Sequence, residues 1–107
     1  FREGKGTAFE GGIRVPCVMR WPGRIPADRT CTEPLMTIDL LPTVAGRVGA
    51  PLPPLPIDGR DVWPVLNGTG TNGERTYWFY YGQNQLQALR RGRWKLLLPH
   101  TAAVLEG

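Results

Sequence analysis

The chain has 107 residues, of which 41% are hydrophobic and 21% charged, and it includes four tryptophans. This length supports one small hydrophobic core rather than two independent ones, and the composition excludes a disordered chain. The formal net charge is +4 without a long run of like charges, so a basic tail is excluded. No stretch is apolar over the length that a membrane span requires.

The N-terminal part is predicted to be a loop followed by a strand. Residues 1–11 are rich in glycine, which favours a loop. Residues 13–21 are mostly apolar, which predicts a strand, with Pro16 at an edge or irregular position because proline cannot donate to a β-ladder. Residues 21–26, Trp-Pro-Gly-Arg-Ile-Pro, have a composition typical of a turn.

A helix is predicted over residues 40–48, where apolar side chains recur at helical spacing. Thr37 or Asp39 can serve as its N-cap. Pro42 is compatible with this helix only in the first turn, where a backbone N–H has no intrahelical partner. Gly49 is expected to end the helix.

Residues 50–56 contain four prolines in Ala-Pro-Leu-Pro-Pro-Leu-Pro. We expect an extended connector between two elements, with a proline-rich peptide ligand as the alternative. A turn at 58–62 and a short turn of helix at 63–66 follow, and Gly68 begins a polar loop.

The last third of the chain is predicted to be rich in β-structure. Strands are expected at 76–81, 86–90 and 94–98, and turns at 82–85 and 91–93. Three consecutive short strands imply an antiparallel meander. One face of such a sheet is usually covered, and the shorter of the two helices is the candidate cover.

Lys5 stands between two glycines in Gly4-Lys5-Gly6. Most lysines are solvent-exposed without a specific role, because burial of an unpaired ammonium group is costly. Glycines, however, let a backbone approach a ligand closely, and the ammonium group suits an anion such as phosphate or sulfate. The stretch lacks the pattern of a phosphate-binding P-loop. Both interpretations of Lys5 remain open on these grounds.

Two further groups of charged residues could carry a function. The basic run Arg-Arg-Gly-Arg-Trp-Lys at 90–95 could bind nucleic acid. We expect instead a tight turn with solvated arginines and with Trp94 facing the core. Glu10 and Arg14 are four residues apart, and such a pair more often orients a loop than performs acid–base chemistry.

The sequence contains only two cysteines, Cys17 and Cys31, and one histidine, His100. These residues cannot fill a tetrahedral zinc site. A disulfide is possible, but two unpaired cysteines are favoured because Cys17 lies in an apolar run.

The order of the motifs points to a family. Five motifs follow one another: 4–16 Gly-Lys-Gly-Thr-Ala-Phe-Glu-Gly-Gly-Ile-Arg-Val-Pro, 20–25 Arg-Trp-Pro-Gly-Arg-Ile, 37–43 Thr-Ile-Asp-Leu-Leu-Pro-Thr, 57–61 Ile-Asp-Gly-Arg-Asp and 88–95 Ala-Leu-Arg-Arg-Gly-Arg-Trp-Lys. Together they resemble the C-terminal part of the type I sulfatases of the alkaline phosphatase superfamily, in the branch of arylsulfatase A and galactosamine-6-sulfatase. The resemblance covers residues 4–98, nearly the whole chain.

The resemblance implies a sulfuric ester hydrolase that uses a formylglycine nucleophile and a divalent cation, usually calcium. In the family, the lysine of the first motif contacts the substrate sulfate, a role that falls on Lys5. The residues expected to shape the loop that presents this lysine are Gly4, Gly6, Thr7, Glu10, Gly11, Gly12 and Arg14. We expect a sulfated small molecule or glycan as substrate and no nucleic acid partner.

The rest of the catalytic set is expected outside these residues. The family modification pattern, Cys/Ser-x-Pro/Ala-x-Arg, fits neither Cys17 nor Cys31, so the formylglycine and the calcium ligands would lie upstream of Phe1. The chain would therefore be a fragment, inactive alone, whose partner is the remainder of its own protein. Family members are commonly exported or lysosomal, and the sequence leaves the compartment open.

The fold expected from the resemblance is of the α/β class. Residues 1–49 would be the tail of the large catalytic domain, 50–56 a connector, and 57–107 a small antiparallel C-terminal subdomain. Two other functions remain open: a related phosphoester or phosphonate hydrolase of the same superfamily, and a β-rich module that binds anions without catalysis.

Overall fold

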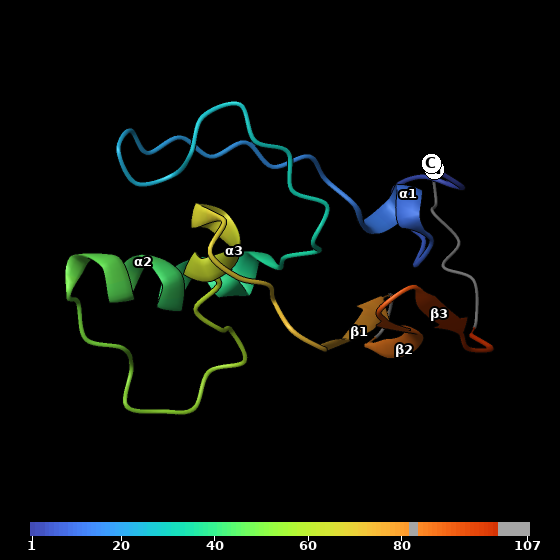
Figure 1. Ribbon diagram of the computed structural model, residues 1–107. Coiled ribbons are helices and arrows are strands. Elements are labelled where there is room, and N and C mark those ends of the chain that lie inside the picture. The colour runs from blue at the N-terminus through green and yellow to red at the C-terminus, as the bar shows by residue number, and fades with distance from the viewer. Residues whose placement is uncertain (82–83, 101–107) are drawn as a thin grey trace. The chain divides into compact units, whose positions relative to one another are not determined.

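The computed structural model describes residues 1–81 and 84–100, and Figure 1 shows its helices and strands. In chain order these are α1 (Glu10–Ile13), the 3-10 turn η1 (Thr37–Asp39), α2 (Leu40–Val48), α3 (Trp63–Asn67), β1 (Thr76–Tyr81), β2 (Gln85–Arg91) and β3 (Trp94–Leu97). The short helices and the antiparallel sheet confirm the predicted α/β class.

The chain divides into two compact units. The sheet unit comprises Phe1–Cys17 and Glu74–Gly107, and the helix unit comprises Val18–Gly73. Each unit has a small buried core. The apolar core residues are Ala8, Tyr77 and Ala88 in the sheet unit and Ala45, Val62 and Val65 in the helix unit. The domain boundaries that the resemblance implies concern a longer protein and stay a prediction.

The predicted meander is confirmed in the sheet unit, where the strand order is β1-β2-β3 with antiparallel pairing. Arg91 pairs with Trp94, so Gly92 and Arg93 form a two-residue turn, and Gly92 has the positive φ of 55° that such turns favour. Of the predicted turn at 82–85, residues 82–83 lie outside the described residues. The predicted cover of this sheet by the shorter helix, α3, stays a prediction, because α3 belongs to the helix unit.

The strand predicted at 13–21 is wrong. Residues 10–13 form the short helix α1, and residues 14–20 have no regular structure. The backbone at Arg14 is extended, with φ −82° and ψ 135°, but an extended segment becomes a strand only when a neighbour pairs with it. Among the described residues none forms a ladder with this segment, and Val15 and Val18 are exposed.

The helix predicted at 40–48 is confirmed with those bounds as α2. Pro42 lies in its first turn, and Gly49 ends it in the left-handed conformation, with φ 70°. Asp39 precedes the helix, but its side chain makes no capping hydrogen bond to it. The short helix predicted at 63–66 is confirmed as α3, followed by Gly68 with φ 82°.

The Asp39 carboxylate is fully buried and accepts hydrogen bonds from backbone N–H groups outside α2. Its Oδ2 accepts a hydrogen bond from Met36 N at 3.0 Å, and its Oδ1 accepts one from Arg60 N at 3.0 Å. Gly59 lies against the Ile38 carbonyl, where an added Cβ would approach the oxygen to 2.0 Å. These contacts hold the motif at 37–43 against the motif at 57–61.

Thr43 completes this connection from α2. Its hydroxyl donates to the Asp39 carbonyl oxygen at 2.6 Å and accepts a hydrogen bond from Val62 N at 2.9 Å. The proline-rich residues 50–56, which are exposed and lack regular structure, join α2 to this loop. Within the described residues, each helix falls short of the length and apolar character needed to cross a bilayer.

Candidate functional site

Lys5 lies at the tip of a tight loop in the sheet unit and is exposed to solvent. The loop turns at Gly6, whose φ of 101° is unfavourable for any residue with a Cβ, and Thr7 Oγ1 donates to the Gly4 carbonyl oxygen at 3.1 Å. Among the described residues, none forms a hydrogen bond or an ion pair with the Lys5 ammonium group. This cation is therefore available to an external anion.

The loop rests on α1 through two glycines that cannot be replaced without a clash. A Cβ at Gly11 would lie 1.9 Å from the Glu3 carbonyl oxygen, and a Cβ at Gly12 would lie 2.2 Å from the Thr7 carbonyl oxygen. Gly11 N also donates to the Arg2 carbonyl oxygen at 3.0 Å. The Lys5 loop therefore packs directly against the backbone of Gly11 and Gly12.

Glu10, the first residue of α1, is surrounded by three cations. Its Oε1 accepts a hydrogen bond from Lys95 Nζ at 2.9 Å, and its Oε2 accepts one from Arg90 Nη1 at 3.0 Å. Arg14 Nε also donates to Oε2, as the spacing of four residues predicted. The two partners on the sheet are well shielded, because the Lys95 and Arg90 side chains are only 16% and 17% exposed.

Glu10 and its three partners, Arg14, Arg90 and Lys95, form the Glu10 cluster. The three cations keep the Glu10 carboxylate ionised. Partial burial alone would raise the pKa of Glu10, but hydrogen bonds from Lys95 and Arg14 and the nearby charges of Lys95 and Arg90 outweigh this effect. The net result is a pKa below the ordinary glutamate value of 4.5. Glu10 thus serves as a fixed negative charge rather than as a group that exchanges protons near neutral pH.

The structure corrects the interpretation of the basic run at 90–95. Trp94 does not face the core: its side chain is 73% exposed. Arg90 and Lys95 are not solvated turn residues: each forms an ion pair with Glu10, which lies 80 and 85 residues away in sequence. The hairpin pairs Arg90 directly with Lys95, one position beyond the pair Arg91–Trp94 that flanks the turn. Two like charges that face each other are destabilising, and the Glu10 carboxylate compensates them.

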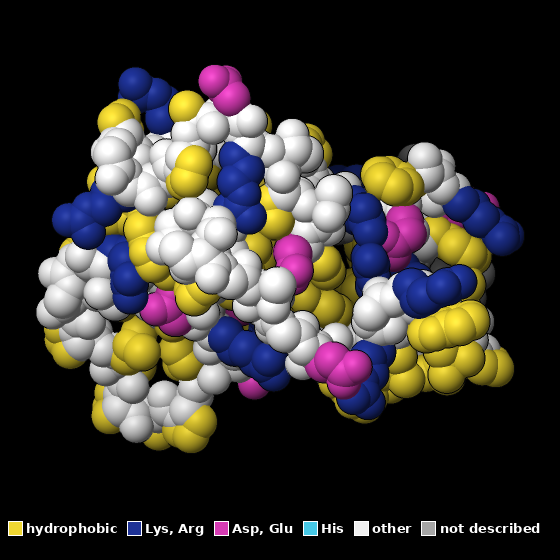
Figure 2. All heavy atoms as spheres, in the orientation of Figure 1, with side chains coloured by type: hydrophobic (Ala, Val, Ile, Leu, Met, Phe, Trp, Pro, Cys, Tyr) yellow, Lys and Arg dark blue, Asp and Glu magenta, His cyan; other side chains and the backbone are white. Residues whose placement is uncertain are grey.

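The other basic residues form no continuous surface on the face that Figure 2 shows. Lys and Arg side chains are spread over this face and are interrupted by acidic and apolar ones. Arg91 pairs with Glu74, and Arg93 lies over the Trp94 ring at 5.2 Å.

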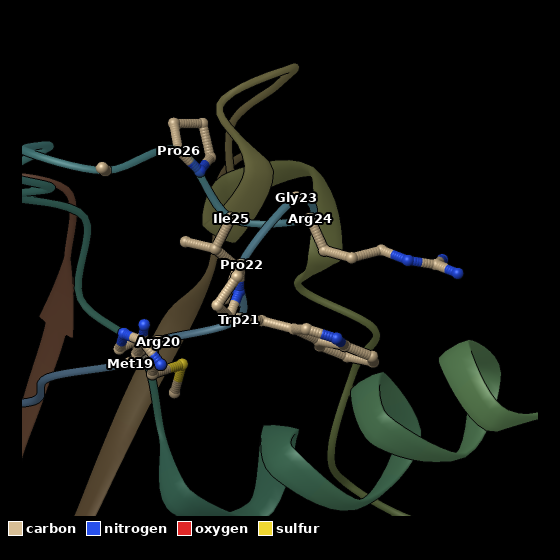
Figure 3. Close-up of a pocket in the computed structure, with 9 residues that line it drawn as sticks. Met19, Arg20, Trp21, Pro22, Gly23, Arg24, Ile25 and Pro26 are labelled. Atoms are coloured by element: carbon tan, nitrogen blue, oxygen red, sulfur yellow. The ribbon is translucent and has the colours of Figure 1, made fainter.

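A hollow of about 550 Å³ lies in the helix unit, lined by the single segment Met19–Ala27. Figure 3 shows the side chains that line it, with the chain turning at Pro22 and Gly23. Trp21 packs edge-on against Trp63 at 5.5 Å, and Arg24 lies over the Trp21 ring. The lining carries two arginines but no acid or nucleophile, so the hollow offers no catalytic constellation.

A metal site and a formylglycine each require particular side chains. Within the described ranges, no three or more His, Cys, Asp or Glu side chains come together as a metal site would require. Cys17 and Cys31 are both exposed and free, so no disulfide joins them. The expectation that calcium and the formylglycine come from outside this chain stays a prediction.

Three known proteins show what the chain is similar to. Steryl-sulfatase of Mus musculus is 46% identical over 91 residues, which are 84% of this chain and 15% of that protein. Arylsulfatase A of Homo sapiens is 47% identical over 79 residues, 74% of this chain and 15% of that protein. Arylsulfatase G of Mus musculus is 50% identical over 72 residues, 66% of this chain and 14% of that protein.

The family match covers almost all of the chain, including the Lys5 loop and the Glu10 cluster. The model of the family described as N-sulphoglucosamine sulphohydrolase, C-terminal, matches residues 4–98. The chain spans only 14–15% of the length of the three relatives named above. It therefore belongs to the sulfatase family and represents part of the family's C-terminal region.

Proposed function

We propose that this chain contributes the sulfate-binding lysine, Lys5, to an enzyme that hydrolyses sulfate esters. The observation that carries the proposal is an exposed ammonium group, free of partners among the described residues, on a loop seated against Gly11 and Gly12. Membership of the sulfatase family supports sulfate rather than another anion as its ligand.

The chemistry follows from the charge and position of Lys5. Negative charge builds on the sulfuryl oxygens and the leaving oxygen as the ester bond breaks. A cation held in place beforehand stabilises that charge without further reorganisation. The loop provides such a position, since Gly6 sets the turn and Thr7 closes it by a hydrogen bond. The formylglycine nucleophile and the calcium ion implied by the resemblance would supply the attack on sulfur and further charge stabilisation from outside this chain.

The whole enzyme is required for the test, because the chain spans a small part of its relatives. In the full-length protein, we expect turnover of an aryl sulfate and a much lower kcat/KM for the matching aryl phosphate. Lys5→Ala should lower kcat/KM for the aryl sulfate by about 100-fold, the effect of removing one donor to a developing oxyanion. Lys5→Arg, which keeps the charge, should lower it less.

Arg93→Gln is the matched control, because it removes an exposed cation whose described contact is the Trp94 ring. It should leave kcat/KM unchanged. Preferential turnover of the phosphate would favour the related phosphoester hydrolase. Turnover of neither substrate, with sulfated polymer still bound, would favour the anion-binding module. Unchanged activity in Lys5→Ala would remove Lys5 from the site.

A further inference from the structure

The Glu10 cluster joins two parts of the sheet unit that are far apart in sequence. We infer that Arg90 and Lys95 are positioning residues for Lys5: they hold the Glu10 carboxylate and thereby fix α1, on which the Lys5 loop is seated. This inference rests on the proposed function of Lys5.

The first step is the link from the hairpin to Glu10. Arg90 on β2 and Lys95 on β3 are directly paired in the sheet, where two like charges would repel each other. Glu10 offsets this repulsion with one oxygen for each: Oε2 at 3.0 Å from Arg90 Nη1 and Oε1 at 2.9 Å from Lys95 Nζ. The Lys95 ammonium group also lies over the Phe79 ring at 4.8 Å, which fixes its place on the sheet.

The second step is the link from Glu10 to the Lys5 loop. Gly11 and Gly12 follow Glu10 directly, and the carbonyl oxygens of the loop approach them more closely than any Cβ would allow. A displacement of Glu10 moves these two glycines, and the loop that carries Lys5 must follow. A misplacement of a catalytic group by about 1 Å can lower the rate by about 100-fold. The hairpin can therefore affect catalysis through the position of Lys5, although its described residues form no hydrogen bond or ion pair with Lys5.

The third step separates a positioning role from simple stabilisation. Arg14 also donates to Glu10, but it lies on the same local segment and cannot fix α1 relative to the sheet. Arg90 and Lys95 come from the sheet and can do so. Loss of either sheet cation should therefore act on catalysis through Lys5, whereas a loss of stability alone would not depend on which residue occupies position 5.

The test is a double-mutant cycle in the full-length protein, with an aryl sulfate as substrate. Lys95→Met should lower kcat/KM by about 10- to 100-fold. In the Lys5→Ala background, the same substitution should lower it less than about 3-fold, because the cation that Lys95 positions is already absent. Lys95→Arg should restore most of the activity. Arg93→Gln, on the same hairpin, is the control and should change neither background.

Each possible result supports or overturns the positioning role or the proposed function. If Lys95→Met lowers kcat/KM by the same factor with and without Lys5, or has no effect with Lys5 present, the positioning role is overturned while the sulfate contact stands. If Lys5→Ala itself has no effect, the proposed function fails first. Thermal unfolding shows whether each variant is folded. Should Lys95→Met not fold, Arg90→Gln replaces it in the cycle, with the same non-additivity expected and the same additivity overturning the inference.

Discussion

Asp39 in the helix unit and Glu10 in the sheet unit each hold distant segments together, but the two carboxylates use different partners. In the helix unit, Asp39 is fully buried and accepts hydrogen bonds from the backbone N–H groups of Met36 and Arg60. In the sheet unit, Glu10 is partly exposed and accepts its hydrogen bonds from the side chains of Arg90, Lys95 and Arg14.

The difference in partners determines what each carboxylate does. Backbone N–H groups are present whatever the side chain, so these two hydrogen bonds of Asp39 do not depend on the side chains of Met36 and Arg60. The Glu10 connection to the sheet depends on two charged side chains, and we expect a change in Arg90 or Lys95 to shift α1 without unfolding the unit. Asp39 is therefore suited to stability, and Glu10 to the placement of the nearby Lys5 loop.

The largest loss of stability is expected for Asp39→Ala. The substitution leaves two N–H groups, of Met36 and Arg60, without the acceptor that they have in the folded unit, which should cost about 3 kcal/mol in the free energy of unfolding. Asp39→Asn keeps one acceptor oxygen and should cost less. Chemical denaturation of the full-length protein measures both. Equal stability of the alanine variant and the unmodified protein would break the contrast with Glu10.

A smaller loss, about 2 kcal/mol, is expected for Gly11→Ala, because the added Cβ would lie 1.9 Å from the Glu3 carbonyl oxygen. Gly4→Ala, in the Lys5 loop that packs against α1, is the control, since a Cβ at Gly4 meets nothing within 4 Å. Denaturation of the two variants side by side should show the difference. If both variants lose the same stability, the close contact between the loop and α1 is not the reason why glycine is needed at position 11.

A smaller effect still, about 1 kcal/mol, is expected for Glu10→Gln, and it should depend on pH. The pKa of Glu10 is below 4.5 in the folded state, so its contribution is complete above pH 4.5 and is lost as the pH falls through the lower, folded value. The difference in stability between Glu10→Gln and the unmodified protein should therefore be greatest near pH 6 and should shrink below pH 4.5.

Glu74→Gln provides the comparison for this titration. Among the described residues, Glu74 forms one ion pair, which is exposed and joins it to Arg91 in the same unit, so its removal should change stability less than the removal of the Glu10 charge. Denaturation at a series of pH values measures both. A Glu10→Gln effect that persists undiminished well below pH 4.5 would show that the ionised carboxylate is not what holds α1.

Much of the fold could be predicted because local signals agree with it. The apolar spacing of α2, its early Pro42 and its final Gly49 are all features of one helix, and the hairpin turn at Gly92 is marked by its glycine. The strand prediction at 13–21 failed because apolar character does not create a pairing partner. A strand needs a neighbour, and the sequence of residues 13–21 contains no information on which neighbour that is.

The candidate site could be predicted only in part. Glu10 and Arg14 are four residues apart, so their contact is visible in the sequence. The contacts of Glu10 with Arg90 and Lys95 span 80 and 85 residues and depend on how the hairpin folds against α1. The placement of Trp94 failed for the same reason: the register that turns Lys95 toward Glu10 turns Trp94 to the other face.

If Lys5 contacts the sulfate group itself, as we propose, its loss should weaken the binding of inorganic sulfate. Calorimetric titration of the full-length protein should show that Lys5→Ala raises the dissociation constant of sulfate by at least about 10-fold, as expected for the loss of a charged hydrogen bond. Arg93→Gln should leave it unchanged. Sulfate binding by Lys5→Ala as tight as that of the unmodified protein would contradict the account.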